Sequence, residues 1–115
     1  MRSMFRRAKL ALLLIVAMSA LGAHAQSTTP EPNTILRLGT GWGIDAFHIQ
    51  VNRPIVNPAN CQSADGYMSE SPHNGFKTHY AAALMAFAMG RQLTVTVSNT
   101  ACVHGRPSII GLQVV

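Results

Sequence analysis

The sequence has few charged side chains and very few acids. Charged residues make up 11% of the 115 positions, with four Asp or Glu against nine Lys or Arg, which gives a formal net charge of +5. Four of the basic side chains lie in the first 25 residues, which contain no acid: Arg2, Arg6, Arg7 and Lys9. The other 90 residues are nearly neutral. The overall basic charge is therefore no argument for nucleic-acid binding.

Residues 1–25 have the three parts of a secretory signal peptide. A basic region precedes the apolar residues 10–20, and the Ala-His-Ala of residues 23–25 places small side chains on both sides of His24, before a cleavage site at Gln26. The apolar run is shorter than the ~20 residues that a membrane-spanning helix needs. No cysteine lies near the cleavage site, which disfavours a lipoprotein. We therefore expect bacterial export to a secreted or periplasmic location, with a mature chain that begins at Gln26.

Cysteine is scarce, and both cysteines, Cys61 and Cys102, lie beyond the leader. In an oxidising compartment the simplest state is one disulfide between them, and the alternative is a pair of free buried thiols. A bond that closes a loop of 41 positions stabilises a domain by roughly 4 kcal/mol in the chain-entropy model. A domain of this size is marginal enough for that contribution to matter.

The chain beyond the leader is long enough for one small domain and too short for two. Residues 26–33 are polar and contain two prolines, so we expect a flexible N-terminal arm. Residues 34–115 then form a single domain. Within it, residues 34–38 and the alternating residues 46–51 flank a glycine-rich turn, which predicts a β-hairpin. Residues 52–65 are expected to be a long loop, followed by a short strand over 66–70.

A helix is predicted over Phe76–Met89, where apolar residues recur at helical spacing on most sides. Asn74 or Ser71 is the expected N-cap, and Gly90 the expected C-terminal glycine. We expect Leu84 and Phe87 to pack in the core, so that replacing either by Ala would cost roughly 2–5 kcal/mol.

Two more strands are predicted after the helix. Residues 93–97 alternate, with Leu93, Val95 and Val97 directed inward. Residues 99–107 are expected to be a loop, and residues 108–115 a last strand with Ile110, Leu112 and Val114 on one face. The expected order is β-β-β-α-β-β, a β-rich α+β class.

Motifs for catalysis are lacking. There is no Gly-x-Ser-x-Gly turn for a serine nucleophile, and disulfide formation would remove both thiolates. The four acids include no pair that spacing brings together for a two-carboxylate mechanism. We therefore expect no enzyme and no cofactor. For metals, the spacing of His73 and His79 is not a ligand spacing, and Met85 and Met89 more often mark core packing than a copper site.

Three residues are candidates for ligand binding. Trp42 lies in the glycine-rich turn, where its ring either stacks on a sugar or folds back over the core. His48 lies in the strand over 46–51. Arg106 follows the second cysteine and either binds an anionic group or is simply solvated.

The order of these features resembles a family. A cysteine in a loop, a short tyrosine-containing strand, the helix Phe76–Met89 ending at Gly90-Arg91, the strand Leu-Thr-Val-Thr-Val-Ser and the segment Gly-Arg-Pro-Ser-Ile-Ile-Gly after Cys102 are similar to small secreted bacterial proteins related to the B subunits of subtilase-cytotoxin-like and pertussis-like toxins. The resemblance implies an OB-like fold, a small antiparallel barrel of about five strands with one buried helix. It also implies a pentameric ring that binds sialylated glycans, but it transfers no individual binding residue.

Two functions stay open at the level of sequence. The chain is either an exported glycan-binding module similar to a toxin B subunit, or an exported structural or inhibitor-type protein that binds a protein partner. The predicted helix has more apolar surface than one sheet can cover, with Ala82, Met85, Ala86 and Met89 in surplus. We therefore expect self-association, and the alternative is a monomer in which the long loop covers the helix.

Overall fold

The computed structural model describes residues 25–41 and 43–115. The expected signal peptide, apart from Ala25, and the candidate Trp42 lie outside these residues. The elements are β1 (Gln26–Thr28), β2 (Ile35–Thr40), β3 (Ala46–Val51), β4 (Tyr67–Glu70), α2 (Phe76–Met89), β5 (Leu93–Val103) and β6 (Arg106–Val114). Within the described part of the chain, no helix has the length and apolar character needed to cross a membrane.

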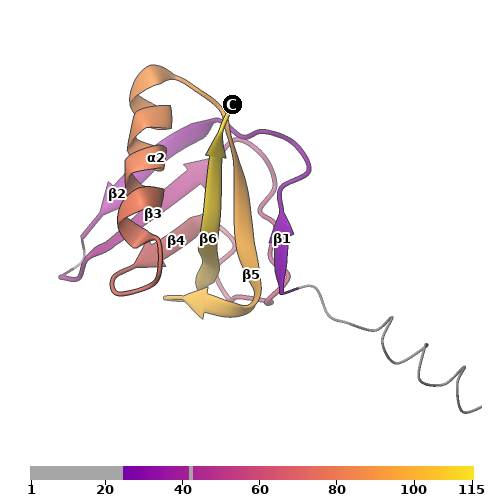
Figure 1. Ribbon diagram of the computed structural model, residues 1–115. Coiled ribbons are helices and arrows are strands. Elements are labelled where there is room, and N and C mark those ends of the chain that lie inside the picture. The colour runs from indigo at the N-terminus through magenta and orange to yellow at the C-terminus, as the bar shows by residue number, and fades with distance from the viewer. Residues whose placement is uncertain (1–24, 42) are drawn as a thin grey trace, which may run out of the picture.

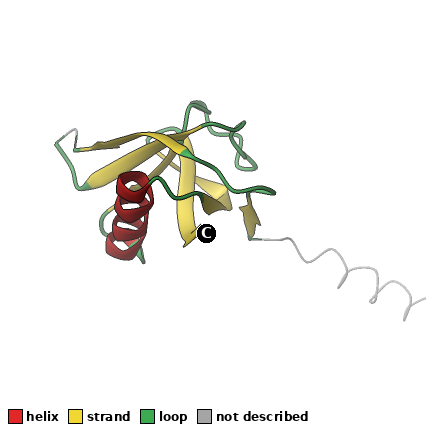
Figure 2. Cartoon of the chain, turned by 90° about the horizontal axis from the view of Figure 1, so that it is seen from above, coloured by secondary structure: helices red, strands yellow, loops and turns green. Residues whose placement is uncertain are grey.

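The strands form one six-stranded sheet in the order β1-β5-β6-β4-β3-β2, with α2 against one face (Figures 1 and 2). The β-rich α+β class is confirmed, but the expected closed antiparallel barrel of five strands is wrong. The sheet is open and mixed, because β4 and β6 run parallel and meet at one register position, Met68 opposite Ser108. The crossover that α2 provides between β4 and β5 makes this parallel pairing feasible.

The hairpin of β2 and β3 and the inward faces of β3 and β5 agree with the sequence pattern. Phe47, Ile49, Leu93, Val95 and Val97 are all fully buried in one apolar cluster. The alternation of apolar and polar residues along these strands identifies that buried face, because side chains alternate across a sheet.

The expected loop over 99–107 is largely strand. β5 continues to Val103, and β6 starts at Arg106 after a two-residue turn in which His104 and Gly105 both have positive φ. Such turns match the twist of a hairpin. Farther along β6, Ile110 is exposed, so it does not share a face with Leu112 and Val114, which pack against the core with the buried Ile109. A register shift in this part of the β5–β6 pairing places Ile110 as an extra residue, since Val97 pairs with Ile109 and Thr96 with Gly111.

Helix α2 has the predicted bounds, but it contacts the sheet through different residues. Ala83 and Ala86 are fully buried, whereas Leu84 and Phe87 are 44% and 45% exposed. The prediction that these two larger side chains supply the core is therefore wrong. The small alanine side chains face the sheet and let the helix approach it closely.

The ends of α2 also differ in part from the prediction. Gly75 is the N-cap, with positive φ and no side-chain cap, so neither Asn74 nor Ser71 fills that role. Gly90 ends the helix as predicted, with φ of 64° and its backbone N–H directed to the carbonyl oxygens of Ala86 and Phe87. A left-handed residue at this position favours glycine.

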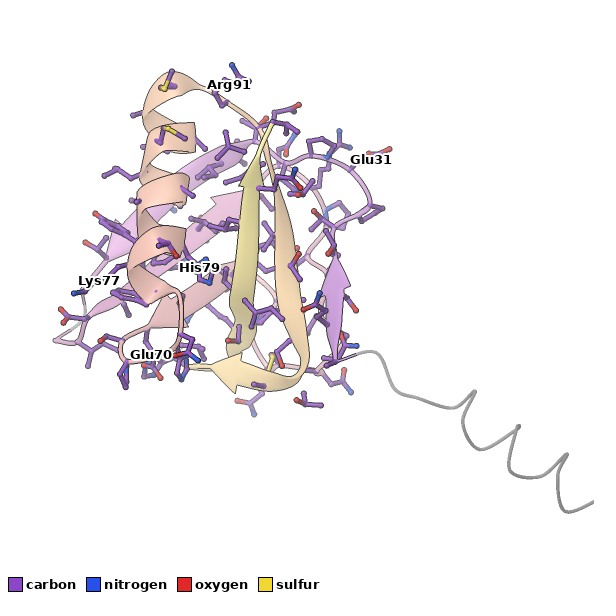
Figure 3. All side chains as sticks on the ribbon, viewed as in Figure 1. Glu31, Glu70, Lys77, His79 and Arg91 are labelled. Carbon is purple, nitrogen blue, oxygen red and sulfur yellow. A yellow bond between two sulfur atoms is a disulfide. The ribbon has the colours of Figure 1, made fainter. Side chains whose placement is uncertain are left out.

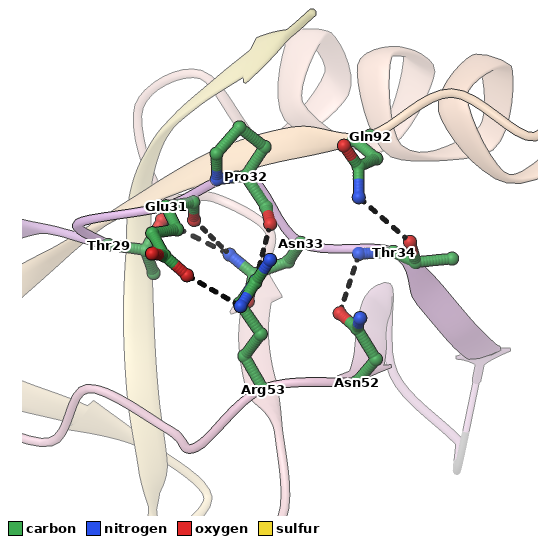
Figure 4. Close-up of polar contacts among 8 residues, drawn as sticks. All are labelled: Thr29, Glu31, Pro32, Asn33, Thr34, Asn52, Arg53 and Gln92. Carbon is green, nitrogen blue, oxygen red and sulfur yellow. Dashed lines mark hydrogen bonds and ion pairs between the residues drawn. The ribbon is translucent and has the colours of Figure 1, made fainter.

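Residues 26–33, expected as a flexible arm, are held against the domain. β1 pairs with β5, and Thr29 and Asn33 are buried. The Asn33 side chain donates to Thr29 Oγ1 and to the Glu31 carbonyl, both at 3.2 Å. Arg53 ties the segment to the chain after β3, with Nη1 2.6 Å from Glu31 Oε2 and Nε donating to the Pro32 carbonyl (Figure 4).

The predicted disulfide between Cys61 and Cys102 is confirmed, with Cα atoms 5.8 Å apart. It joins the loop between β3 and β4 to the end of β5. The same loop is held by the Asn57 side chain, which donates to the Cys61 carbonyl and accepts from its N–H. The Val56 N–H also donates to the Tyr67 hydroxyl at 2.9 Å.

Candidate functional site

The candidate site lies on the side chains of β2 and β3 that point away from the core. Phe47 and Ile49 face α2, so His48 and Gln50 face the other way, and Arg37 joins them because it pairs with Gln50 across the hairpin. In Figure 1 the turn between β5 and β6 lies at the bottom of the view, below β4. Val103 packs there with Ala46 and Met68 in a second buried cluster.

A polar hollow of about 350 Å³ opens where these elements meet. Arg37 and Arg106 bring two positive charges to its lining and Asp65 brings one negative charge, so the hollow is a candidate site for an anion. The lining residues are Arg37, Leu38, Gly39, His48, Gln50, Asp65 and Arg106.

Asp65 and Arg106 form a bidentate ion pair in the wall of the hollow. Arg106 Nε lies 2.7 Å from Asp65 Oδ1, and Nη2 lies 3.2 Å from Oδ2. The hydrogen bonds from Arg106 hold the pKa of the Asp65 carboxyl below its usual value. The turn supports this contact, because the Ser63 N–H donates to the Gly105 carbonyl at 2.8 Å. The pair fixes the plane of the guanidinium group at the edge of the hollow.

His48 shares the same carboxylate. Its Nε2 lies 3.7 Å from Asp65 Oδ1, and its side chain is only 12% exposed. Burial lowers the pKa of His48, and the charge of Arg106 lowers it further against the opposing effect of Asp65. Gly66 makes this position available: a Cβ there would collide with His48 Nε2 and with the Ile49 carbonyl oxygen.

A second hollow, of about 310 Å³, also has Arg106 in its lining and is mainly apolar. Ile44 and Met68 supply its apolar lining, and His104 and Arg106 complete it. His104 Nε2 is 2.6 Å from Glu70 Oε2, at the end of β4 where Figure 3 labels the glutamate. The two hollows share Arg106 in their lining, and we call them together the bipartite groove.

Two of the three sequence candidates meet in this groove. His48 and Arg106 come together through Asp65, while Trp42 lies outside the described residues. The groove also contains three residues that were not predicted from the sequence, Arg37, Gln50 and Asp65. Arg37 and Gln50 could have been found, because the alternation along the predicted hairpin places both on the outer face beside His48. No sequence pattern indicated Asp65, because it reaches the site only through the turn after Cys61.

The groove combines charged and polar groups with an apolar surface. Within residues 25–41 and 43–115, no three His, Cys, Asp or Glu side chains are grouped so that they could hold a metal ion. Asp65 and Glu70 are each engaged by a basic partner. Charge-assisted hydrogen-bond donors beside an apolar surface can orient a polar ligand without a reaction.

Comparisons with known proteins add no relative. No family model matches the chain, and neither the curated proteins nor the solved structures gave a match.

Proposed function

We propose that the chain is an exported, non-enzymatic binding module that takes an acidic glycan in the bipartite groove. The sequence resemblance to toxin B subunits favours sialylated glycans as the ligand and another cell's surface as the place of action. No catalytic step is part of the proposal.

The observation that carries the proposal is the side-chain set of the polar hollow. Arg37 is exposed and has no ion pair among the described residues, so its charge is available to a carboxylate. Gln50 adds an amide that can hydrogen-bond hydroxyls, and Asp65 holds Arg106 in place. The carboxylate of an acidic sugar can accept charge-assisted hydrogen bonds from Arg37, and its hydroxyls can pair with neutral polar groups.

The second candidate function is protein binding, and it is supported by the outer face of α2. Four large apolar side chains are exposed there: Leu84, Met85, Phe87 and Met89. An apolar patch on one helix is typical of an interface with another protein. A second copy of this chain is one such partner. A ring of copies, a pentamer by resemblance, would make weak glycan contacts multivalent.

A glycan array with labelled wild-type protein tests the proposal. We expect retention on sialylated glycans, and roughly tenfold or greater loss in Arg37→Gln, since removing a charged hydrogen bond costs about 1.5–3 kcal/mol. Lys77→Gln is the matched control because it removes the same charge from the exposed start of α2. Equal loss of binding in both variants would mean that retention depends on net charge and not on Arg37. If wild-type protein is not retained on any sialylated glycan, the protein-binding function is favoured.

Light scattering at micromolar concentration tests self-association. We expect a mass of several chains, and a shift toward one chain when Met85 and Met89 are both replaced by Lys. A single-chain mass for wild-type protein would contradict the ring. The proposal of a ligand site in the groove would then apply to a monomer.

A further inference from the structure

Arg106 is the one residue that lines both hollows. A guanidinium group has five N–H donors. Nε and Nη2 bind the carboxylate of Asp65, and Nη1 donates to the His104 carbonyl at 3.4 Å. These contacts use three donors and leave two for a ligand. Arg106 can therefore bind a ligand that extends over it from one hollow to the other.

The two hollows differ in chemistry over a short distance. His48 lines the polar hollow and Met68 the apolar one, and the two residues are directly opposite each other in the pairing of β3 with β4. Side chains in this relation have Cβ atoms about 5 Å apart. A ligand that fills both hollows must change from polar to apolar over about one sugar ring or one substituent.

The apolar hollow has a defined wall. Met68 is buried and Ile44 is exposed, so Met68 forms the floor and Ile44 remains accessible at the edge. Both line the hollow that does not include Arg37. Such a surface gains free energy by covering a methyl or acyl group and gains none from a hydroxyl.

We infer that the ligand of this groove carries an apolar acyl or methyl substituent on the same sugar ring as its carboxylate, with the carboxylate on the Arg37 side and the substituent over Ile44 and Met68. The inference rests on the proposed function and names the ligand class within it. Ile44 is the specificity-determining residue, and Arg106 binds both parts of the ligand.

Two probes test the inference by calorimetry: sialyllactose, which carries an acetamido group, and the same trisaccharide with a hydroxyl group in its place. We expect wild-type protein to bind the acetamido probe roughly tenfold more tightly, the factor typical of a small apolar group in a fitted pocket. Ile44→Ala should bring the two affinities within about a factor of three, because it removes the wall of the hollow. Leu36→Ala is the matched control, since Leu36 is an exposed apolar residue outside the groove, and it should keep the full preference.

The outcomes separate this inference from the proposed function. Equal affinity of wild-type protein for both probes overturns the ligand class while the glycan-binding function stands. A preference that survives Ile44→Ala overturns the role of that residue. Absence of binding for both probes overturns the proposed function, and the ligand class with it.

Discussion

Single residues determine how closely α2 approaches the sheet. The ring of Phe47 lies 5.8 Å from the Phe76 ring and 5.5 Å from the Tyr80 ring, measured between centroids. Ala83 and Ala86 fill the rest of that contact. Phe47 of the sheet is fully buried, whereas Phe87 of α2 is about half exposed. The two phenylalanines therefore contribute differently to the core.

Phe47→Ala and Phe87→Ala should have clearly different effects on the free energy of unfolding. Phe47→Ala leaves a cavity under α2 and should cost about 3–5 kcal/mol. Phe87→Ala removes a half-exposed ring and should cost about 1 kcal/mol or less. Urea denaturation measures both values. If Phe87→Ala proved as costly as Phe47→Ala in the isolated chain, the described orientation of α2 would be wrong.

Gly66→Ala should damage the polar hollow directly. The added Cβ would meet His48 Nε2 and the Ile49 carbonyl oxygen, so the imidazole or the backbone must shift. We expect a loss of about 1–3 kcal/mol in stability and weaker binding of sialyllactose. Gly111→Ala is the control, because its Cβ would lie 3.4 Å from Thr96 Cβ, at the edge of ordinary contact. Similar effects of the two substitutions on binding would contradict the described placement of His48.

The burial of His48 makes stability depend on pH. Its pKa is lowered in the folded chain, chiefly by burial and then by Arg106, so the unfolded chain binds more protons. Stability should therefore fall as the pH decreases through about 6.5, the usual pKa of histidine. His79 acts in the same direction, because burial lowers its pKa too.

Urea midpoints between about pH 8 and pH 5 measure this dependence. His48→Gln should give a shallower decrease than wild type, and the slope that remains should include the contribution of His79. A variant profile parallel to that of wild type would contradict the burial of His48.

At the scale of elements, the disulfide holds the loop that carries Asp65. Replacing Cys61 and Cys102 together by Ser should destabilise the domain by roughly 4 kcal/mol, because the closed loop spans 41 positions. Chemical denaturation gives the value. We also expect weaker sialyllactose binding under conditions where the variant is still folded, since the turn before β4 positions Asp65 beside Arg106. Unchanged binding would mean that Asn57 and Tyr67 alone hold the loop.

Elements with a strong repeating pattern were predictable from the sequence. The alternation in β3 and β5 gave the buried face, and Gly90 marked the end of α2. The sequence pattern did not reveal the turn at His104 and Gly105 or the bulge at Ile110. Both depend on the register in which β5 pairs with β6. The order of apolar and polar residues within each strand does not determine that register. The side of α2 that packs was also hidden, because apolar residues occur on every side of that helix.

At the scale of the whole molecule, the groove is assembled from segments far apart in the chain. Arg37 comes from β2, Asp65 from the loop before β4, and Arg106 from the start of β6. The parallel pairing of β4 with β6 brings the last of these beside the hairpin. The sequence identified His48 and Arg106 singly, but only the strand order shows that Asp65 joins them.

Backbone amide NMR of the mature chain during titration with sialyllactose tests the central claim most directly, because it reports where a ligand binds. We expect saturable shifts concentrated at Arg37, His48, Gln50, Asp65 and Arg106, with smaller shifts at Ile44 and Met68, and none at the exposed residues of α2. Saturable shifts confined to α2 or to the segment before β2, or no saturable shifts in the groove at all, would contradict the assignment of the groove as an acidic-glycan site.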